Sequence, residues 1–410
     1  MGRLARIAWR NVWRNRRRTL IAVIAIALAL ALMLFFDGLL GGAKQAIYGN
    51  TVKLQGGNVQ VHAPGYRERA KRLPLLPLAD PEAITQAALA QPDVVAASQR
   101  IETSGMLSSR EGTMPVVITG VEPERTASVS LIAQNVVEGR NLTAGDEDVI
   151  LIGQALAHQL EVSAGDRVAL VGRATHEQMR RRTMTIVGIY DLGIAEVEKR
   201  MVYVSLTEAQ TLFDLREQAT EVAVFLDTVG QEAPVVASLS AALPGYEVDA
   251  WDTLDPSTKT SMEMEDQVME IFGLIILVIA GVGILNLMLM AVFERTREIG
   301  IIAAMGLKRH EIVILFLLEG VFIGLLGALV GTALGGLVNA YYGQVGMEWA
   351  GASSEYSELA ALLGGRLYFH VGLADLLGRA LTVAIIAALA ALYPAWRASR
   401  REPAEALHYV

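Results

Sequence analysis

The sequence contains no cysteine among its 410 residues. Disulfide bonds, thiolate metal sites and a lipid attached to an N-terminal cysteine are therefore all excluded. Charge is also scarce, since charged residues make up 19% of the chain and hydrophobic residues 53%. A wholly soluble chain is usually more charged, and a pure bundle of membrane helices is more apolar. The composition therefore predicts a protein with a membrane part and a soluble part.

The chain also lacks the short motifs of common enzyme classes. It contains no HExxH metal motif, no GxSxG in a strand-turn-helix context and no GxxxxGKS/T phosphate loop. The histidines do not pair at metal-ligand spacing, and we interpret His62, His158 and His176 as surface or structural residues. We therefore expect no catalytic residue, no bound cofactor or metal, and no ATP hydrolysis through such a loop.

Long apolar runs are present, but they are unevenly spaced. One lies near the N-terminus and three follow Gln267, with about 230 mostly polar residues between the first and the second. A run of 18 or more apolar residues can cross the ~30 Å hydrocarbon core as a helix. We predict transmembrane helices at 19–40, 267–293, 312–338 and 378–396. The expected fold is an α-helical membrane protein with one span, a large domain at 41–266, and three further spans.

Basic residues predict the orientation of these spans. The first 18 residues carry seven arginines and no acid, and the loop 294–311 and the tail 397–410 are also basic. The loop 339–377 has a single basic residue, Arg366, among four acidic ones. By the positive-inside rule, both termini and the loop 294–311 face the cytoplasm, and the large domain lies outside.

The first 18 residues have a pattern of their own. Their arginines recur at steps of three and four, with Trp9 and Trp13 between them, which predicts an amphipathic helix on an anionic inner leaflet. A plain basic anchor is the alternative and gives the same orientation. A cleaved signal peptide is disfavoured, because no small-x-small site directly follows Phe36.

The domain at 41–266 is acidic, with 19 Lys and Arg against 31 Asp and Glu, which leaves the rest of the chain at +4. A phosphate backbone requires a basic surface, so nucleic acid is excluded as its partner. Short runs of β-type residues alternate with Gly, Pro and Asp, which predicts an α+β domain. We expect two lobes, 52–122 with 218–252, and 123–217. Strands are predicted near 58–62, 94–102, 114–121, 149–152, 167–171, 183–190, 200–204 and 221–226, and helices at 81–90, 154–160, 207–212 and 233–242.

The third predicted span carries glycines at steps of three and four, which is the spacing of one helix face. Small residues on one stripe allow helices to approach closely in lipid, although glycine is also ordinarily tolerated in membrane helices. The stripe consists of Gly320, Gly324, Gly327, Gly331 and Gly335. Glu319 in the same span is a functional candidate because it is ionisable, or a structural residue paired with a neighbour such as Asn286.

Two further segments are candidates for binding. The stretch 173–182 holds Arg180, Arg181 and Arg182, which predicts either a solvated hairpin tip or a surface for docking a partner protein. The apolar patterns that flank the domain predict that the first two spans continue beyond the bilayer as helical stalks. A mouth between these stalks could receive a lipid or another apolar ligand, or serve packing alone. Its residues would be Phe35, Phe36, Met262, Met264 and Met269.

Several segments resemble a known family. The stretch 294–310, ERTREIGIIAAMGLKRH, is similar to the coupling segment of ABC-transporter permeases of the macrolide-exporter, lipoprotein-releasing and cell-division types. The tail YPAWRASRREPAEAL and the stretch VILIGQALAHQLEVSAGDRVAL resemble the ending and the outer domain of the same permeases. The start WRNVWRNRRRT, the DGLL after the first span and GGNVQVHAPGY look more like the lipoprotein-releasing group.

The resemblance implies a multi-pass protein of the bacterial inner membrane with its large domain in the periplasm. It implies no nucleotide-binding domain on this chain, whereas macrolide exporters usually carry one at the N-terminus. A separate ATPase, present in two copies beneath a dimer of identical or related permeases, would bind ATP and Mg. The residues that would couple to it are Glu294, Arg295, Arg297, Glu298, Ile299, Ile302, Gly306 and Lys308. Their apolar face suits a groove on another protein.

The resemblance leaves three functions open. The first is mechanical release of lipoprotein cargo from the outer leaflet of the inner membrane, with a periplasmic chaperone docked near 173–182, where one permease of that group has a hook. The second is efflux of small molecules or peptides through an adaptor and an outer-membrane channel. The third is signalling to a cell-wall hydrolase.

Overall fold

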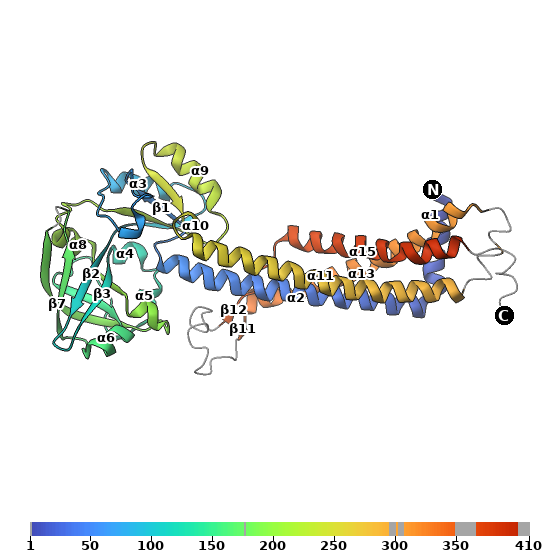
Figure 1. The fold of residues 1–410 in the computed structure, drawn as a ribbon, viewed down its shortest axis with the longest axis horizontal. Helices are drawn as coiled ribbons and strands as arrows, with labels where there is room; N and C mark the ends of the chain where they lie inside the picture. Colours follow the sequence, from blue (N-terminus) through green and yellow to red (C-terminus); the bar gives the residue numbers. More distant parts are fainter. Residues whose placement is uncertain (1, 176–177, 295–300, 302–306, 349–365, 401–410) are drawn as a thin grey trace. The chain divides into compact units, whose positions relative to one another are not determined.

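The computed structural model describes residues 2–175, 178–294, 301, 307–348 and 366–400 (Figure 1). The chain divides into two compact units. We call residues 1–43, 261–347 and 367–410 the helical unit, and residues 44–260 and 348–366 the sheet unit. Two of the boundaries between the units therefore fall within long helices, after residues 43 and 260, and the other two follow residues 347 and 366.

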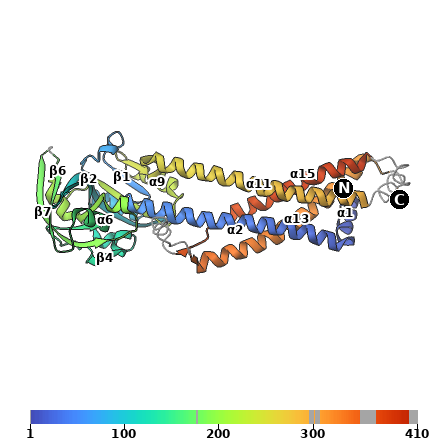
Figure 2. The ribbon, with the colours of Figure 1, turned by 60° about the horizontal axis from the view of Figure 1, so that its bottom comes forward.

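In its described residues, the helical unit contains the short helix α1 (Gly2–Arg14) and the long helices α2 (Arg16–Leu54), α11 (Pro256–Glu294), α13 (Arg309–Val345) and α15 (Leu373–Ser399) (Figures 1 and 2). Four segments are long and apolar enough to cross a membrane: Arg16–Leu54, Pro256–Met290, Arg309–Val345 and Leu373–Ser399. Three of the four predicted spans lie within one of these segments, whereas the span 267–293 extends past Met290 but stays within α11.

A large apolar core holds these helices together, and a smaller cluster lies around Phe316 and Ala395. The buried side chains of the large core include Leu30 of α2, Ile284 of α11, Ile323 of α13 and Ala387 of α15. The last helix is longer than the predicted span and contains Pro394 in its interior. Proline is tolerated in membrane helices because neighbouring groups satisfy the freed backbone. Two short strands, β11 (Met347–Glu348) and β12 (Arg366–Leu367), pair with each other.

The sheet unit contains one ten-stranded sheet in the order β10-β1-β9-β2-β3-β8-β5-β7-β4, with β6 pairing with β2 and β7. Most neighbours are antiparallel, whereas β3 with β8 and β5 with β7 are parallel. The strands are β1 (Val59–His62), β2 (Val94–Ser108), β3 (Thr113–Val121), β4 (Val136–Gly139), β5 (Val149–Gly153), β6 (Arg167–Arg173), β7 (Met179–Tyr190), β8 (Met201–Ser205), β9 (Glu221–Leu226) and β10 (Glu247–Ala250).

Short helices pack on this sheet, and their starts follow from the sequence. Asp80 accepts a hydrogen bond from the backbone N–H of Ala83 and precedes Pro81, which is a favoured combination at a helix N-terminus. Ser205 caps α8 in the same way through Glu208 N–H. The helices are η1 (Ala70–Arg72), α3 (Pro81–Leu89), α4 (Pro123–Thr126), α5 (Leu131–Gln134), α6 (Gln154–Leu160), α7 (Ala195–Glu198), α8 (Leu206–Phe213), α9 (Glu232–Ala242) and α10 (Trp251–Leu254).

The strands of the two predicted lobes belong to this one sheet, but buried side chains gather in two large clusters. One surrounds Ile118 and Phe213, and the other surrounds Val224 and Leu239. Strand β2 contributes Ala97 to one cluster and Ile101 and Leu107 to the other, and it extends to Ser108 rather than ending at Glu102 as predicted. The long strand therefore joins the two halves of the unit.

Candidate functional site

The segment predicted to contact an ATPase lies mostly outside the described residues. This holds for Arg295, Arg297, Glu298, Ile299, Ile302 and Gly306. At its two ends, Glu294 is the last residue of α11 and Lys308 precedes α13. The N–H of Lys308 donates to Glu311 Oε2 at 2.8 Å, which places a carboxylate at the N-terminus of α13.

The glycine stripe of α13 faces two helices. A Cβ at Gly320 or Gly324 would lie 2.3 or 2.5 Å from the Cβ of Ala391 or Ala387 in α15. Gly327, Gly331 and Gly335 instead meet α2, where an added Cβ would lie 2.6 to 2.8 Å from its atoms. A side chain at any of these positions would push a neighbouring helix away. The stripe therefore sets the spacing of α13 from both α15 and α2.

Glu319 is buried beside this stripe, and one of its partners, Asn11, was not suggested by the sequence. Asn11 Nδ2 donates to Glu319 Oε1 at 2.6 Å, which links α1 to α13. Asn286 lies on α11 with an exposed side chain. A cavity of about 20 Å³ adjoins Glu319 and is lined also by Asn15, Arg18 and Thr19. It is polar and large enough for one water molecule.

A second polar link joins α2 to α15. Arg379 donates to Asp37 through Nε at 3.0 Å and through Nη2 at 3.3 Å. Close to it, Asn339 Nδ2 donates to the carbonyls of Leu34 and Gly335, both at 2.9 Å. These links were missed from the sequence, where Asp37 and Arg379 each look like an isolated charge at the margin of an apolar run.

The residues of the predicted mouth do not form one feature. The ring of Phe35 packs edge-on against Phe369 at 5.3 Å and against Phe36 at 5.8 Å. Met262 and Met269 are half-buried on α11. Phe36 and Met264 are exposed, at 43% and 61%. Apolar surface is thus available on both helices, and packing accounts for Phe35.

The three arginines predicted for docking belong to β7 rather than to a loop. Arg180 lies 3.6 Å from Asp214, and Arg182 Nε lies 2.5 Å from Asp148 and 3.1 Å from Glu208. The hydrogen bond from Arg182 lowers the pKa of Asp148 below its ordinary value, although partial burial opposes this. Arg181 points to the other face of the sheet and is exposed. Two of the three side chains therefore serve contacts inside the unit.

Within the sheet unit, the C-terminal part of α2 is fastened to the loop after β9 and to the start of α10. Gln45 Nε2 donates to the carbonyl of Val229 at 2.9 Å, and the N–H of Val229 donates to Gln45 Oε1 at 3.1 Å. The ring of Tyr48 stacks on Trp251 with centroids 6.4 Å apart. These contacts hold in place the part of α2 that the sequence predicted as a helical stalk.

The start of α11 is capped by Asp255, which accepts from the N–H groups of Ser257 and Thr258. Burial alone would raise the pKa of Asp255, but these bonds and those from the two hydroxyls lower it overall. Gln55, just after α2, also donates to Asp255 at 3.5 Å. The two predicted stalks are therefore tied to each other through this cap.

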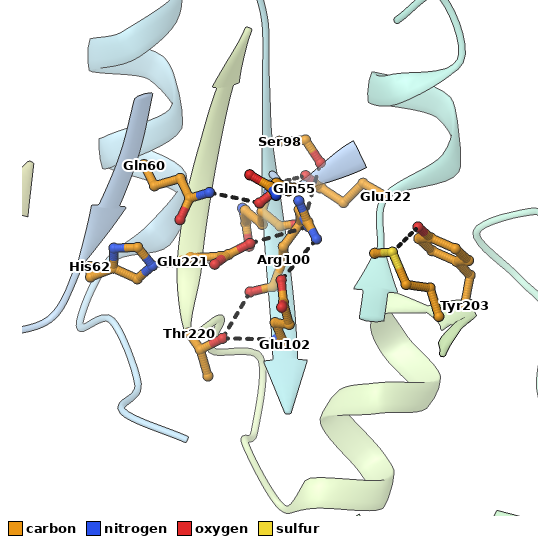
Figure 3. A network of polar contacts seen from close by, with 12 residues as sticks. Gln55, Gln60, His62, Ser98, Arg100, Glu102, Glu122, Tyr203, Thr220 and Glu221 are labelled. Atoms are coloured by element: carbon orange, nitrogen blue, oxygen red, sulfur yellow. Dashed lines mark hydrogen bonds and ion pairs between the residues drawn. The ribbon is translucent and has the colours of Figure 1, made fainter. Parts of the chain in front are cut away.

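A buried cluster of charges lies between β1, β2 and β9 (Figure 3). Arg100 Nη2 donates to Glu102 at 3.1 Å, and Arg100 Nε lies 3.2 Å from Glu221. His62 Nε2 lies 3.2 Å from the other oxygen of Glu221, and its ring stacks on Tyr66 at 3.6 Å. His62 is fully buried, so its structural interpretation fits this place in the fold.

Two carboxylates share one guanidinium in this cluster, and their pKa values diverge. Burial and the charge of Glu221 raise the pKa of Glu102 to about 7, against the influence of Arg100. Burial also acts on Glu221, but Arg100 and His62 outweigh it and lower its pKa. Among the described residues, no group of three or more His, Asp or Glu side chains could hold a metal. The cluster can take up a proton near neutral pH, and we assign it no catalytic role.

Two family models match the chain. The MacB-like periplasmic core domain matches residues 19–242, and the FtsX-like permease C-terminal segment matches residues 270–403. The first match alone covers more than half of the chain.

Curated relatives are similar over most of their length. The chain is 27% identical to the lipoprotein-releasing system transmembrane protein LolC of Xylella fastidiosa, over 81% of this chain and 82% of that protein. The LolC of Neisseria meningitidis is 25% identical, over 77% and 78%. The macrolide export ATP-binding/permease protein MacB of Agrobacterium fabrum is 25% identical, over 80% of this chain but 51% of that protein.

Proposed function

The chain belongs to the family of ABC-transporter permeases with a MacB-like periplasmic core domain and an FtsX-like C-terminal segment, and we propose that it releases lipid-anchored proteins. In this proposal the four long helices cross the inner membrane as one span followed by three, and the sheet unit faces the periplasm. The choice of cargo is supported by the LolC relatives, which the chain matches over 82% of their length in the first case.

A separate ATPase supplies the energy in this proposal. Two copies bind ATP and Mg beneath a dimer of permeases, which are identical or related chains. The segment from Glu294 to Lys308 contacts the ATPase, because its sequence combines an apolar face with flanking charges suited to a groove. In this proposal the permease chain itself carries no catalytic residue.

The observation that carries the proposal is the continuity of α2 from Arg16 to Leu54. At 1.5 Å per residue, its 39 residues make a helix of about 58 Å, roughly twice the thickness of the hydrocarbon core. The end of this helix is fastened within the sheet unit through Gln45 and Tyr48. A helix anchored in this way carries a rigid-body movement from the span to the domain.

Release from proteoliposomes tests the cargo. The purified complex with its ATPase is reconstituted with a triacylated protein, and ATP and a soluble acceptor are added. We expect the acylated protein to leave the vesicles with ATP and to remain with a non-hydrolysable analogue. Retention of the cargo with ATP would contradict lipoprotein release.

Substitutions in the coupling segment test the energy source. We expect Ile302→Asp and Gly306→Pro to abolish cargo-stimulated ATP hydrolysis, because the first places a charge on the apolar face and the second alters the segment's end. Gly336→Ala is the control, since a Cβ there meets nothing within 4 Å. Normal stimulation in both coupling variants would refute the assignment of this segment.

The MacB relative favours a second candidate function, which is efflux of small molecules or peptides through an adaptor. Deletion would then lower resistance to a compound, and the purified permease would bind an adaptor protein. Signalling to a cell-wall hydrolase is a third outcome, and it predicts hydrolase activation without any transported cargo.

A further inference from the structure

Strand β3 has a free edge along its first four residues. On one side it pairs with β2 throughout, from Ser108 opposite Thr113 to Arg100 opposite Val121. On the other side, the ladder with β8 begins only where Val117 meets Met201. In the part of the chain that the structure describes, residues 113–116 therefore have a neighbouring strand on one side only.

The direction of the backbone groups on this edge follows from the hydrogen bonds around it. The N–H of Val117 donates to the carbonyl of Arg200 at 2.7 Å, away from β2. Both backbone groups of a strand residue point to the same side, and successive residues alternate. Thr113 and Pro115 therefore direct their backbone groups away from β2 as well. Because proline has no N–H, the edge offers one donor and two acceptors.

A cavity of about 470 Å³ is lined by residues 114–117 of β3, so it begins one residue beyond Thr113. Its walls come from β2, β3, α6 and the segment around α7, and include Ser104, Pro115 and Gln159. Four residues of strand are about 13 Å long, and the volume is within the usual range for ligand sites. The groove therefore has room for a short extended segment lying beside β3.

The charged side chains that line the groove are Glu196, Lys199 and Arg200. Lys199 Nζ lies 3.2 Å from Glu196, and Arg200 lies 3.7 Å from the other oxygen of the same carboxylate. Two cations thus share one anion, which leaves a net positive charge in a domain that is otherwise acidic. The side chain of Arg200 is 73% exposed. Such a rim attracts an acidic partner.

We propose that the free edge of β3 is a docking site for an extended, acidic segment of a partner protein, which adds as a strand beside residues 113–116. The backbone of β3 supplies the hydrogen bonds, and Lys199 and Arg200 select acidic side chains. This mode of recognition takes affinity from main-chain pairing and specificity from the groove walls. The site is independent of the cargo and lies on a different strand from Arg180 and Arg182.

The test uses the full-length protein in a neutral detergent and three labelled eight-residue peptides. The first alternates valine with glutamate, the second alternates valine with lysine, and the third is the first with N-methyl groups on alternate peptide bonds. We expect the acidic peptide to bind with a dissociation constant below about 1 mM, and the other two peptides to bind at least tenfold more weakly. We also expect it to slow hydrogen exchange of the Thr113 amide at least tenfold.

Two variants separate the contributions of backbone and charge. Thr113→Pro removes the edge donor and the hydroxyl bond to Ser108 but no backbone hydrogen bond to β2, and Arg200→Glu reverses an exposed charge. Each should weaken binding at least fivefold, whereas Arg69→Glu, an exposed arginine outside the groove, should leave it unchanged. Failure of the acidic peptide to bind, equal binding of the acidic and basic peptides, or indifference to Arg200→Glu would overturn the proposal. If the N-methylated peptide binds as well as the first, the groove attracts ligands by charge alone, as it would a lipid headgroup. This result would also overturn the proposal.

Discussion

Gln45 and Val229 exchange two hydrogen bonds across 184 residues of sequence, at 2.9 and 3.1 Å. The side-chain amide of Gln45 provides the donor and acceptor that a neighbouring peptide unit would provide. Because both partners of Val229 come from one side chain, the end of α2 and the loop after β9 must move together.

Gln45→Ala should loosen this joint without unfolding the protein. It leaves the N–H and C=O of Val229 without their partner, which costs about 1–2 kcal/mol locally. We expect hydrogen exchange of the Val229 amide to accelerate about tenfold. Under the proposed function, ATP hydrolysis should continue while cargo release falls. Gln86→Ala, which removes an exposed hydrogen bond to Glu82, is the control. An equal effect of the two variants would contradict the claim that Gln45 couples α2 to the loop after β9.

A double-mutant cycle on Asn11 and Glu319 should reveal coupling between α1 and α13. Each alanine variant removes one partner of a partly buried hydrogen bond, so the second substitution should cost less than the first. We expect a coupling of about 1 kcal/mol, as for polar contacts between membrane helices. Thermal unfolding in detergent measures it. The same cycle with Asn11 and Asn286 should be additive, and additivity in the Glu319 cycle would refute the contact.

Gly324→Ala should destabilise the helical unit. Its Cβ would lie 2.5 Å from that of Ala387, so α13 and α15 must separate, at a cost of about 1–3 kcal/mol. Gly336→Ala on the same helix gains helix propensity at no steric cost and should be neutral or stabilising. Melting temperatures from intrinsic tryptophan fluorescence compare them. Equal melting temperatures would show that the stripe does not set the helix spacing.

Glu102→Gln should change how the sheet unit responds to pH. The folded pKa of Glu102, about 7, lies above its ordinary value of 4.5. Below pH 4.5 the carboxyl is protonated in both the folded and the unfolded state, so burying it does not lower the free energy of unfolding. Between pH 4.5 and 7 only the unfolded chain releases its proton, so stability falls as pH rises, and the full cost of about 3 kcal/mol is present above pH 7.

The variant should therefore gain stability over the wild type at pH 8 and gain much less at pH 5. Hydrogen exchange of the β2 and β9 amides in the full-length protein reports this difference. Glu68→Gln, at an exposed position, should show no such dependence. A wild-type and variant difference that is constant between pH 5 and 8 would exclude a raised pKa.

The family and the existence of four membrane-length helices could be predicted from the sequence, because apolar runs and short motifs are local properties. The pairing of Asn11 with Glu319 could not, since 308 residues separate them and the pattern around Asn11 indicates a helix at the membrane surface. For the same reason, the ion pair between Asp37 and Arg379 could not be predicted from the sequence.

The side-chain alternation of the arginines in β7 could have been recognised from the sequence. The predicted strand began at Thr183, because charged residues are uncommon in strands. Had the strand been extended to Met179, alternation alone would have placed Arg180 and Arg182 on one face and Arg181 on the other. The identity of each partner, such as Asp148 for Arg182, could not be predicted in this way, because it depends on the three-dimensional fold.

The contact between Asn11 and Glu319 also sets an order of events during synthesis. A ribosome adding about 5–20 residues per second needs roughly 15–60 s to travel the 308 residues between them. Throughout that time α1 and the first span exist without α13, and with neither the carboxylate nor the glycine stripe that will receive them. The last strand of the sheet ends at Ala250, well before α13 is made. The ten-stranded sheet can therefore form first, and the helical unit closes only when translation is nearly finished.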